Sequence, residues 1–400
     1  MGSTTRSSSL APGVRPREIW AWAFYDFANS GYTTVVITAV FAAYFVSEVA
    51  GRAPWATFAW TSALAVSSAL IMLTAPLVGA YADAHAAKKR LLFITTVGCA
   101  VFTAGLAFVG SGDFVLGVTL IILSNYFFGS GENLIAAFLP EIAAAEGMGR
   151  ISGWGWSLGY FGGLVSLGAS LAYVTYAQAQ GAAATDFVPV TMLITAGIFA
   201  LASLPTFLLL RERAQPVAGA SDVLRSAFGR VGDTLRHARR HADLWRFLLC
   251  LVFYQAGIQT VVALAAVYAQ EVMGFTTRDT LVLILLVNIT AAVGAFAFGH
   301  IQDRLGHVTT LVLTLIGWLI AVVLAWLAED VVLFWIVANI VGLCLGASQS
   351  AGRALVGYLS PPGRTAEFFG LWGLAVKLSA ILASLDVRRG RRAAVEAAGM

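Results

Sequence analysis

Charged residues are scarce in this 400-residue chain, since aspartate, glutamate, lysine and arginine make up only 12% of it. Soluble domains carry about a quarter charged residues, so this scarcity excludes an ordinary soluble globular protein. In their place the sequence has 59% hydrophobic residues, 40 glycines and a mean hydropathy of +0.81. This composition predicts an all-α polytopic membrane protein that is embedded in a lipid bilayer.

Metal-ligating and nucleophilic patterns are equally sparse. Cys99, Cys250 and Cys344 each stand alone in an apolar stretch, which excludes a disulfide framework and provides no metal-ligand spacing. Neither H-E-x-x-H nor G-x-S-x-G occurs. We therefore expect no metal, no cofactor and no catalysis, and a membrane-embedded enzyme is the unfavoured alternative. The net charge of +4 belongs to loops of a membrane protein, so we expect no nucleic-acid partner.

Apolar stretches that are long enough to cross a bilayer recur along the chain. A helix needs about 20 apolar residues for one crossing. This length predicts eleven spans, at 19–47, 57–82, 91–110, 114–139, 151–178, 187–210, 246–270, 279–301, 308–328, 331–357 and 366–385. The predicted domains are a cytoplasmic N-terminal segment at 1–18, a six-helix bundle at 19–210, a cytoplasmic linker with an amphipathic helix at 211–245, a five-helix bundle at 246–385 and a polar basic tail at 386–400.

The basic residues predict how the chain is oriented. With the N-terminus in the cytoplasm, most lysines and arginines fall in cytoplasmic loops, and the outer loops hold only Arg52 and Arg278. This asymmetry follows the positive-inside rule and predicts a multi-pass protein of the cell (plasma) membrane with a cytoplasmic N-terminus. The exceptions are Lys377 inside the eleventh span and four arginines at 388–392, which an eleven-span count places outside.

A short polar pattern occurs once in each half. "GAYADAHAAKKR" begins at Gly79, near the end of the second span, and "GHIQDRLGH" begins at Gly299, at the end of the eighth. Both contain G-x-x-x-D, with the aspartates at Asp83 and Asp303. Two bundles with the same turn between their second and third helices form a parallel repeat, the architecture of rocking transporters.

The repeated turn resembles that of the major facilitator superfamily. A closer resemblance, to its vacuole-effluxer-like branch, lies in "WAFYDFANSGYTT", "SGWGWSLGYFGG", "FYQAGIQT" and "LGASQSAGRALVGYLSPPGRTAEFFGLWGLAVK". It implies a bacterial member with two pseudo-symmetric helical bundles and transport by alternating access. Fungal autophagy-related members of this branch are associated with amino-acid efflux, so amino acids are the implied solute class.

The repeated turn and its bases are the predicted gating residues. Small glycines allow helices to approach closely, and an aspartate at a helix end can cap a neighbouring helix or pair with a base. The alternative is that the loop only fixes topology through its bases. Ala84 and Ala86 stand where the superfamily has a base and a glycine, so we expect the first latch to be the weaker one. The full set is Gly79, Asp83, Lys88, Lys89, Arg90, Gly299, Asp303 and Arg304.

Ionisable and amide side chains inside the spans are the predicted substrate or proton pathway. Asp26, Glu132, Arg353 and Lys377 all lie roughly 12–16 Å from the inner surface at 1.5 Å per residue, which suggests one polar layer. The resemblance implies that the first, fourth, seventh and tenth spans line a central cavity. The set is Asp26, Asn29, Glu132, Asn133, Gln255, Gln259, Gln349, Arg353 and Lys377.

Each charged member of this set has a plainer alternative. Asp26 either couples protons or caps a helix, and Glu132 suits a proton carrier because burial disfavours its charged form. Arg353 suits bidentate recognition of a carboxylate but equally an anchor at the inner leaflet. Lys377 can simply pair with an acid on a neighbouring helix.

The resulting hypothesis is a monomeric secondary transporter that moves a small solute by alternating access and couples it to protons. Family-like sequence stops near Leu382, so we expect the second half to lack a twelfth helix. One alternative is that the eleventh segment does not cross the membrane, which leaves ten spans and a cytoplasmic tail. A non-transporting or truncated family member is the other.

Overall fold

The computed structural model describes residues 9–216, 229, 232–233, 238–328 and 330–397. Nearly all of these residues are helical. The one β-bridge in the described residues joins Leu10 to Ala143 and ties the N-terminal segment beneath the first bundle. The fold class is therefore all-α, as the composition predicts.

Helices α1 to α8 form the first half of the molecule. Its first span is a composite of α1 (Pro16–Tyr32), the π-helix η1 (Thr33–Ala39), α2 (Val40–Tyr44) and the π-helix η2 (Phe45–Val49). The other elements are α3 (Ala56–His85), α4 (Lys88–Gly105), η3 (Leu106–Phe108), α5 (Phe114–Ala136), α6 (Leu139–Ile142), η4 (Ala145–Gly147), α7 (Met148–Ala179) and α8 (Ala184–Leu209).

Helices α10 to α14 form the second half. Its elements are η5 (Ala238–His241), α10 (Ala242–Glu271), α11 (Thr277–Leu305), α12 (His307–Leu327), α13 (Val331–Leu359) and α14 (Thr365–Ala397). Most of the predicted amphipathic helix of the linker lies outside the described residues. The helix α14 continues to Ala397, beyond the predicted end of the eleventh span at 385. Its last residues are rich in alanine and arginine, which are strong helix formers.

Eleven helices in the described part of the chain are long and apolar enough to cross a membrane. They coincide with the eleven predicted spans, and most boundaries differ by only a few residues. The chain is therefore a multi-pass membrane protein with six spans before the linker and five after it.

Local sequence explains where several of these helices begin. Thr276 Oγ1 accepts a hydrogen bond from the N–H of Asp279, whose carboxylate accepts from the N–H of Thr276, and this capping box starts α11. Asp330 Oδ1 accepts from the N–H of Leu333 (2.7 Å) and starts α13.

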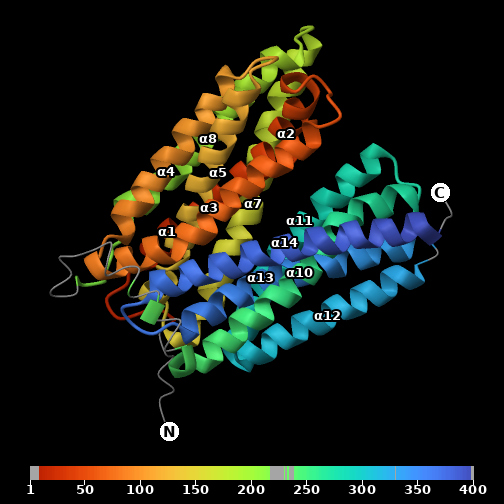
Figure 1. Ribbon diagram of the computed structural model, residues 1–400. Coiled ribbons are helices and arrows are strands. Elements are labelled where there is room, and N and C mark those ends of the chain that lie inside the picture. The colour runs from red at the N-terminus through yellow and green to blue at the C-terminus, as the bar shows by residue number, and fades with distance from the viewer. Residues whose placement is uncertain (1–8, 217–228, 230–231, 234–237, 329, 398–400) are drawn as a thin grey trace.

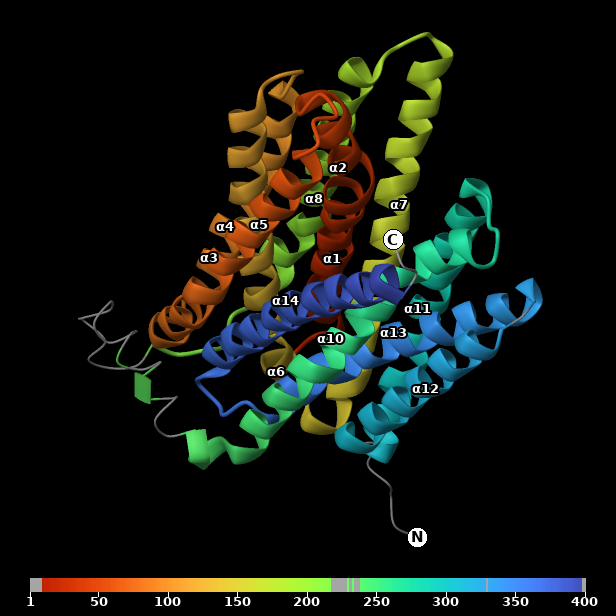
Figure 2. The same cartoon turned by 45° about the vertical axis from the view of Figure 1, so that its right-hand side comes forward.

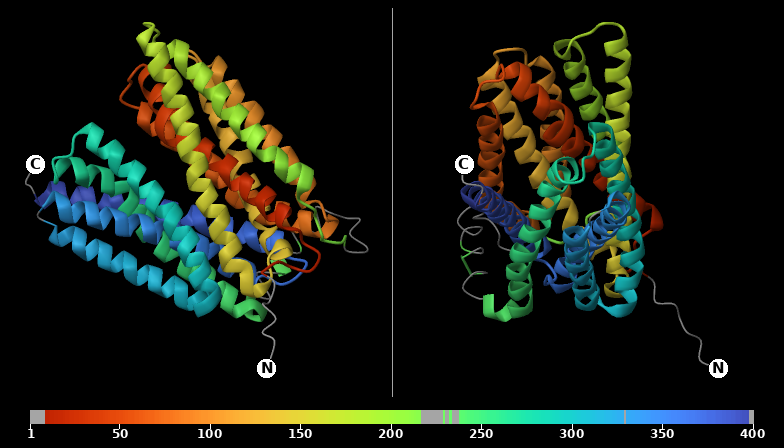
Figure 3. Two further views of the ribbon diagram at one scale, coloured as in Figure 1. Left: turned by 180° about the vertical axis from the view of Figure 1, so that it is seen from behind. Right: turned by 90° about the vertical axis from the view of Figure 1, so that its right-hand side faces the viewer.

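The two halves meet at one end and diverge towards the other (Figure 1). We call these the closed end, where Asp83 and Asp303 lie, and the open end, where Gln180 and Val272 lie. Figure 2 and Figure 3 show the same divergence from other sides. At the closed end α3 packs on α14, and α7 packs on α11.

Glycines make both of these contacts close. A Cβ on Gly79 would lie less than 3 Å from the backbone of Ala366 and Glu367 on α14. A Cβ on Gly299 would lie 2.8 Å from the carbonyl oxygen of Gly149 on α7. Helix backbones approach this closely only where a side chain is absent.

The hydrophobic clusters follow the same division. One large cluster at the closed end combines residues of both halves, such as Trp22 and Phe138 with Leu355 and Phe368. Towards the open end, the cluster around Phe41 contains first-half residues alone, and a smaller one contains second-half residues alone. Among the residues that the structure describes, apolar packing therefore joins the halves at one end only.

Candidate functional site

A central cavity lies between the halves above the closed end. It has two adjoining lobes, of about 310 and 450 Å³. Both lobes are lined by Thr33, Phe128, Glu132, Trp156, Leu345, Gln349 and Trp372, so they form one continuous space. Its walls come from α1, η1, α5 and α7 of the first half and from α10, α11, α13 and α14 of the second.

Most of the predicted pathway residues line this cavity. Asp26, Asn29 and Arg353 line the first lobe, Gln255, Gln259 and Lys377 line the second, and Glu132 and Gln349 line both. Asn133 does not. It is buried at the junction of α3, α5 and α14, where a Cβ on Gly373 would meet its side chain. Asn133 is one residue from Glu132, so it points to a different side of α5.

An ion pair between the halves lies at the floor of the first lobe. Arg353 Nη1 on α13 donates to Asp26 Oδ2 on α1 at 2.7 Å. Arg353 Nε donates to Ser152 Oγ (3.1 Å), and Nη2 donates to the carbonyl oxygen of Ser152 (2.8 Å). The guanidinium is thus held by three hydrogen bonds to the first half, and Arg353 is only 3% exposed.

Aromatic rings enclose this guanidinium. Its Cζ lies 4.6 Å from the ring centroid of Trp22 and 5.4 Å from that of Trp156. Such cation–π contacts contribute roughly 0.5–2 kcal/mol each, most where water is excluded. Gly155 allows the arrangement, since a Cβ there would lie 2.7 Å from both Arg353 Nη2 and Trp22.

Glu132 and Lys377 both face the cavity. Glu132 enters the cavity from α5 of the first half and Lys377 from α14 of the second. Within the described part of the chain neither forms an ion pair. Besides the Asp26–Arg353 pair, the cavity therefore presents the Glu132 carboxylate and the Lys377 ammonium group from opposite halves.

Several uncharged groups add hydrogen-bonding capacity. Among the described residues, Asn29 Oδ1 and Trp156 Nε1 are buried and have no hydrogen-bond partner. Gln259 Nε2 donates to Ser379 Oγ (3.1 Å), which fixes its orientation, and Tyr160 Oη donates weakly to Gln349 Oε1 (3.4 Å). Buried polar groups are normally paired, so Asn29 and Trp156 are suited to contact a ligand or water.

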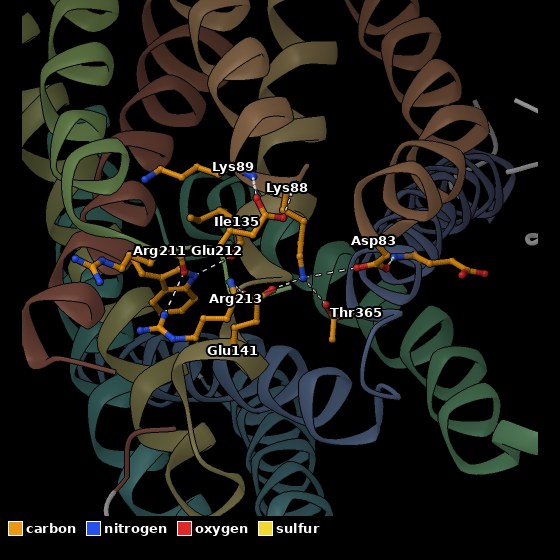
Figure 4. A network of polar contacts seen from close by, with 11 residues as sticks. Asp83, Lys88, Lys89, Ile135, Glu141, Arg211, Glu212, Arg213 and Thr365 are labelled. Atoms are coloured by element: carbon orange, nitrogen blue, oxygen red, sulfur yellow. Dashed lines mark hydrogen bonds and ion pairs between the residues drawn. The ribbon is translucent and has the colours of Figure 1, made fainter. Parts of the chain in front are cut away.

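The first repeated turn holds the closed end together (Figure 4). Asp83 Oδ2 accepts from the N–H of Glu367 in the first turn of α14 (2.9 Å). Lys88 Nζ lies 3.6 Å from Asp83 Oδ1 and donates to Thr365 Oγ1 (2.9 Å), just at the start of α14. An acid at a helix N-terminus is favourable, and here that helix belongs to the other half.

Residues outside the motif extend this network within the first half. Lys88 also pairs with Glu141, and Lys89 Nζ donates to the carbonyl oxygen of Leu210 (2.6 Å). Glu212 accepts from the N–H groups of Lys88 (2.8 Å) and Lys89 (3.0 Å), so it caps the start of α4. Arg90, which we grouped with these bases, is exposed.

The second repeated turn makes the equivalent contact with α7. Asp303 Oδ1 accepts from the N–H of Arg150 (3.2 Å), and Oδ2 lies 3.3 Å from Arg150 Nε. Arg304 is exposed and takes no part in this pair. Arg304 is the counterpart of Ala84, so the first turn loses no contact by having alanine at that position. The side chain of Asp83 is also more buried than that of Asp303. This geometry does not favour our expectation that the first latch is weaker.

Some residues of the site escape sequence reasoning. Ser152, Trp22 and Trp156 surround Arg353, yet serine and tryptophan are unremarkable in apolar spans. Glu141, in the short helix α6, and Glu212, in the segment after α8, lie outside the repeated pattern. The available signal was their charge at span ends, which is also expected of ordinary solvated loops.

Two known proteins are similar in sequence to most of this chain. The chain is 27% identical over 371 residues to an uncharacterized MFS-type transporter, YxiO, of Bacillus subtilis, covering 91% of this chain and 86% of the relative. It is 23% identical over 329 residues to autophagy-related protein 22 of Kluyveromyces lactis, covering 74% and 66%.

The fold is that of solved transporters of small molecules. The proton:xylose symporter XylE, bound to 6-bromo-6-deoxy-D-glucose, superposes with a TM-score of 0.70 at 15% identity, covering 94% of this chain and 89% of XylE. These relatives are transporters and not enzymes. A family model described as "Vacuole effluxer Atg22 like" matches residues 55–387. The chain therefore belongs to the vacuole effluxer Atg22-like family of major facilitator transporters.

Proposed function

We propose that this membrane transporter moves a small zwitterionic solute, of which amino acids are the leading class, by alternating access of the central cavity. The observation that carries the proposal is the pair Glu132 and Lys377. A carboxylate and an ammonium group face one cavity from opposite halves, and neither forms an ion pair within 4 Å among the described residues. Charges inside a membrane are costly and generally serve a substrate or ion pathway.

The two charges suit the two ends of an amino acid. Glu132 would accept hydrogen bonds from the solute ammonium, with Asn29 Oδ1 as a further acceptor. Lys377 would pair with the solute carboxylate, with Trp156 Nε1 as a further donor. A solute that bridges both halves would bind best when the halves lie at one particular separation, so binding and closure would be linked.

The closed end is proposed to be the cytoplasmic end. The first turns of α4 and α7 at this end carry Lys88, Lys89, Arg90 and Arg150, and Arg15 and Arg17 lie at the start of α1. The positive-inside rule then places the N-terminus in the cytoplasm and the cavity open to the outside. Asp83 and Asp303, with their partners at the starts of α14 and α7, are the proposed latches of this outward-facing state.

Proton coupling is part of the proposal. Asp26 and Glu132 are carboxylates that line the cavity, and a carboxylate that can be reached by water can load and release a proton. We further propose that the protein is a monomer of the cell membrane, since one chain supplies both halves of the cavity.

Counterflow in proteoliposomes tests this function. Vesicles that contain the purified protein are loaded with one unlabelled amino acid, and uptake of the same labelled amino acid is followed for each member of a panel. The proposal predicts saturable, transient accumulation for at least one zwitterion, and little for the matched amine or carboxylic acid that lacks one charge.

Lys377→Gln provides the internal control, because it removes one of the two recognising charges and leaves the fold's closed end intact. This variant should weaken uptake of the zwitterion more than it weakens uptake of the matched amine. A protein that exchanges none of the panel, although it is folded and inserted, would support the alternative of a non-transporting family member.

A further inference from the structure

The partners of Arg353 share one property. Arg353 belongs to α13 of the second half, whereas Asp26 and Trp22 belong to α1 and Ser152 and Trp156 to α7, all in the first half. Its described hydrogen bonds and ring contacts therefore all cross from one half to the other. None of them can survive if the halves separate at the closed end.

This placement argues against a role of Arg353 in holding a solute carboxylate. Three of its five N–H groups already point to Asp26 and Ser152, and two indole rings cover its faces. A solute could reach the guanidinium only by displacing groups that hold the cavity floor in place. The contacts are those of a structural closure between two moving parts.

Asp26 differs from the other partners because it carries charge and also faces the cavity. Removing one charge of a buried pair is strongly unfavourable for the remaining one. Asp26 lines the first lobe, so water in the cavity can deliver a proton to its carboxylate. Protonation would leave Arg353 with only neutral partners at the closed end.

We infer that Asp26 and Arg353 form a latch between the halves, and that a proton taken up by Asp26 from the cavity releases the latch so that the closed end can open. The inference rests on the proposed transport function and adds the site where a proton acts on the gate. The proton adds to the Asp26 carboxylate, and the ion pair becomes a neutral hydrogen bond.

The other elements around Asp26 present two charged groups, Glu132 and Lys377, and several neutral ones. Glu132 faces Asp26 from α5 across the first lobe, and Lys377 of α14 lies beyond Glu132 in the second lobe. α7 presents the neutral Ser152 and Gly155. Glu132 interacts electrostatically with Asp26 and Arg353 but forms no described ion pair with the opposite half, so its charge state would affect the solute more than the closure.

Distances between spin labels test the latch without any solute. The full chain carries Gln180→Cys on the first half and Val272→Cys on the second, both exposed at the open end, with the three native cysteines replaced by alanine. In proteoliposomes at pH 8 we expect mainly the long distance of the structure. Asp26→Asn should raise the fraction of the short distance by about tenfold, because an amide cannot hold Arg353 by charge.

Lowering the pH to 5.5 should raise the short-distance fraction in the parent protein and leave Asp26→Asn unchanged. Asp186→Asn, at an exposed aspartate near the open end, is the matched control and should behave like the parent. Arg353→Gln breaks the same pair from the other side and should match Asp26→Asn, and it replaces that variant if the latter does not fold.

The inference is overturned if these latch variants keep the parent's long distance at pH 8, or if the parent's distances do not respond to pH. Both results are independent of solute. A protein that fails counterflow but shows the pH-driven shift would refute the proposed solute and retain the latch.

Discussion

Ala86 ends α3 in the left-handed region, with φ of 48°. The equivalent position of the second repeat is Gly306, at φ of 88°. Both positions therefore have a positive φ, although ψ is 50° at Ala86 and 158° at Gly306. A left-handed alanine costs roughly 1–2 kcal/mol, whereas glycine loses about 0.5–1 kcal/mol more entropy on folding.

Ala86→Gly should accordingly stabilise the protein by about 0.5–1 kcal/mol. The measurement is thermal unfolding of the purified protein in one detergent. Gly306→Ala is the matched control and should lower the melting temperature. A lower melting temperature for Ala86→Gly would show that the left-handed turn is not strained.

Glu132 is the residue at which solute recognition and proton coupling can be separated. Glu132→Gln keeps the shape of the side chain but removes the charge that would face a solute ammonium. We expect the KM of uptake to rise about 10- to 100-fold, in line with roughly 1.5–3 kcal/mol for a hydrogen bond to a charged group.

The same variant should keep the pH response of the open-end distances, since Arg353 is held by Asp26 and Ser152 and not by Glu132. Uptake kinetics and label distances are compared on one preparation. An unchanged KM together with a lost pH response would assign the proton to Glu132 and not to Asp26.

The sequence predicted which charged residues line the cavity but not which of them pair with one another. The depth of Asp26, Glu132, Arg353 and Lys377 along their helices follows from the rise of a helix, and all four line the cavity. Glu132 lines the cavity and Asn133 does not, because only one side of α5 faces the cavity. Hydropathy does not contain that information where both neighbours are polar.

At the scale of elements, the eleven spans were predictable because bilayer thickness fixes the length of an apolar helix. The π-helical turns η1 and η2 in the first span were not. An apolar run has the same composition whether its hydrogen bonds close at i+4 or i+5. Thr33, the first residue of η1, lines both lobes, so this irregular segment lies at the cavity.

The contact between α3 and α14 depends on Gly79. Gly79→Leu would place a side chain against the backbone of Ala366 and Glu367, which cannot move aside as a flexible side chain could. We expect the closed end to be held apart and solute uptake to fall by at least about tenfold, the scale of the 1–3 kcal/mol cost of overpacking.

The matched control is Gly168→Leu on α7, where an added Cβ meets no atom within 4 Å. Both variants are compared for uptake and for the label distance at the open end. Equal uptake in the two variants would mean that close approach of α3 and α14 is not required for transport.

At the scale of the whole molecule, the structure is one cavity between two halves that are joined at one end. The two-half organisation followed from the repeated G-x-x-x-D turn. The conformational state did not, because in the proposed alternating cycle one sequence adopts both states. It is shown instead by where apolar packing crosses between halves, as at Trp22 and Phe368, and where it does not.

Solute-protected labelling in the cavity tests the central claim most directly. Gln349→Cys places a thiol where both lobes meet, and a membrane-impermeant thiol reagent is applied to the outside of intact cells or right-side-out vesicles that carry this variant without its native cysteines. We predict labelling from outside, slowed by the zwitterion that supports counterflow and not by its singly charged analogues. Labelling at the same rate with and without that zwitterion, or a thiol that cannot be reached from outside, would contradict the account.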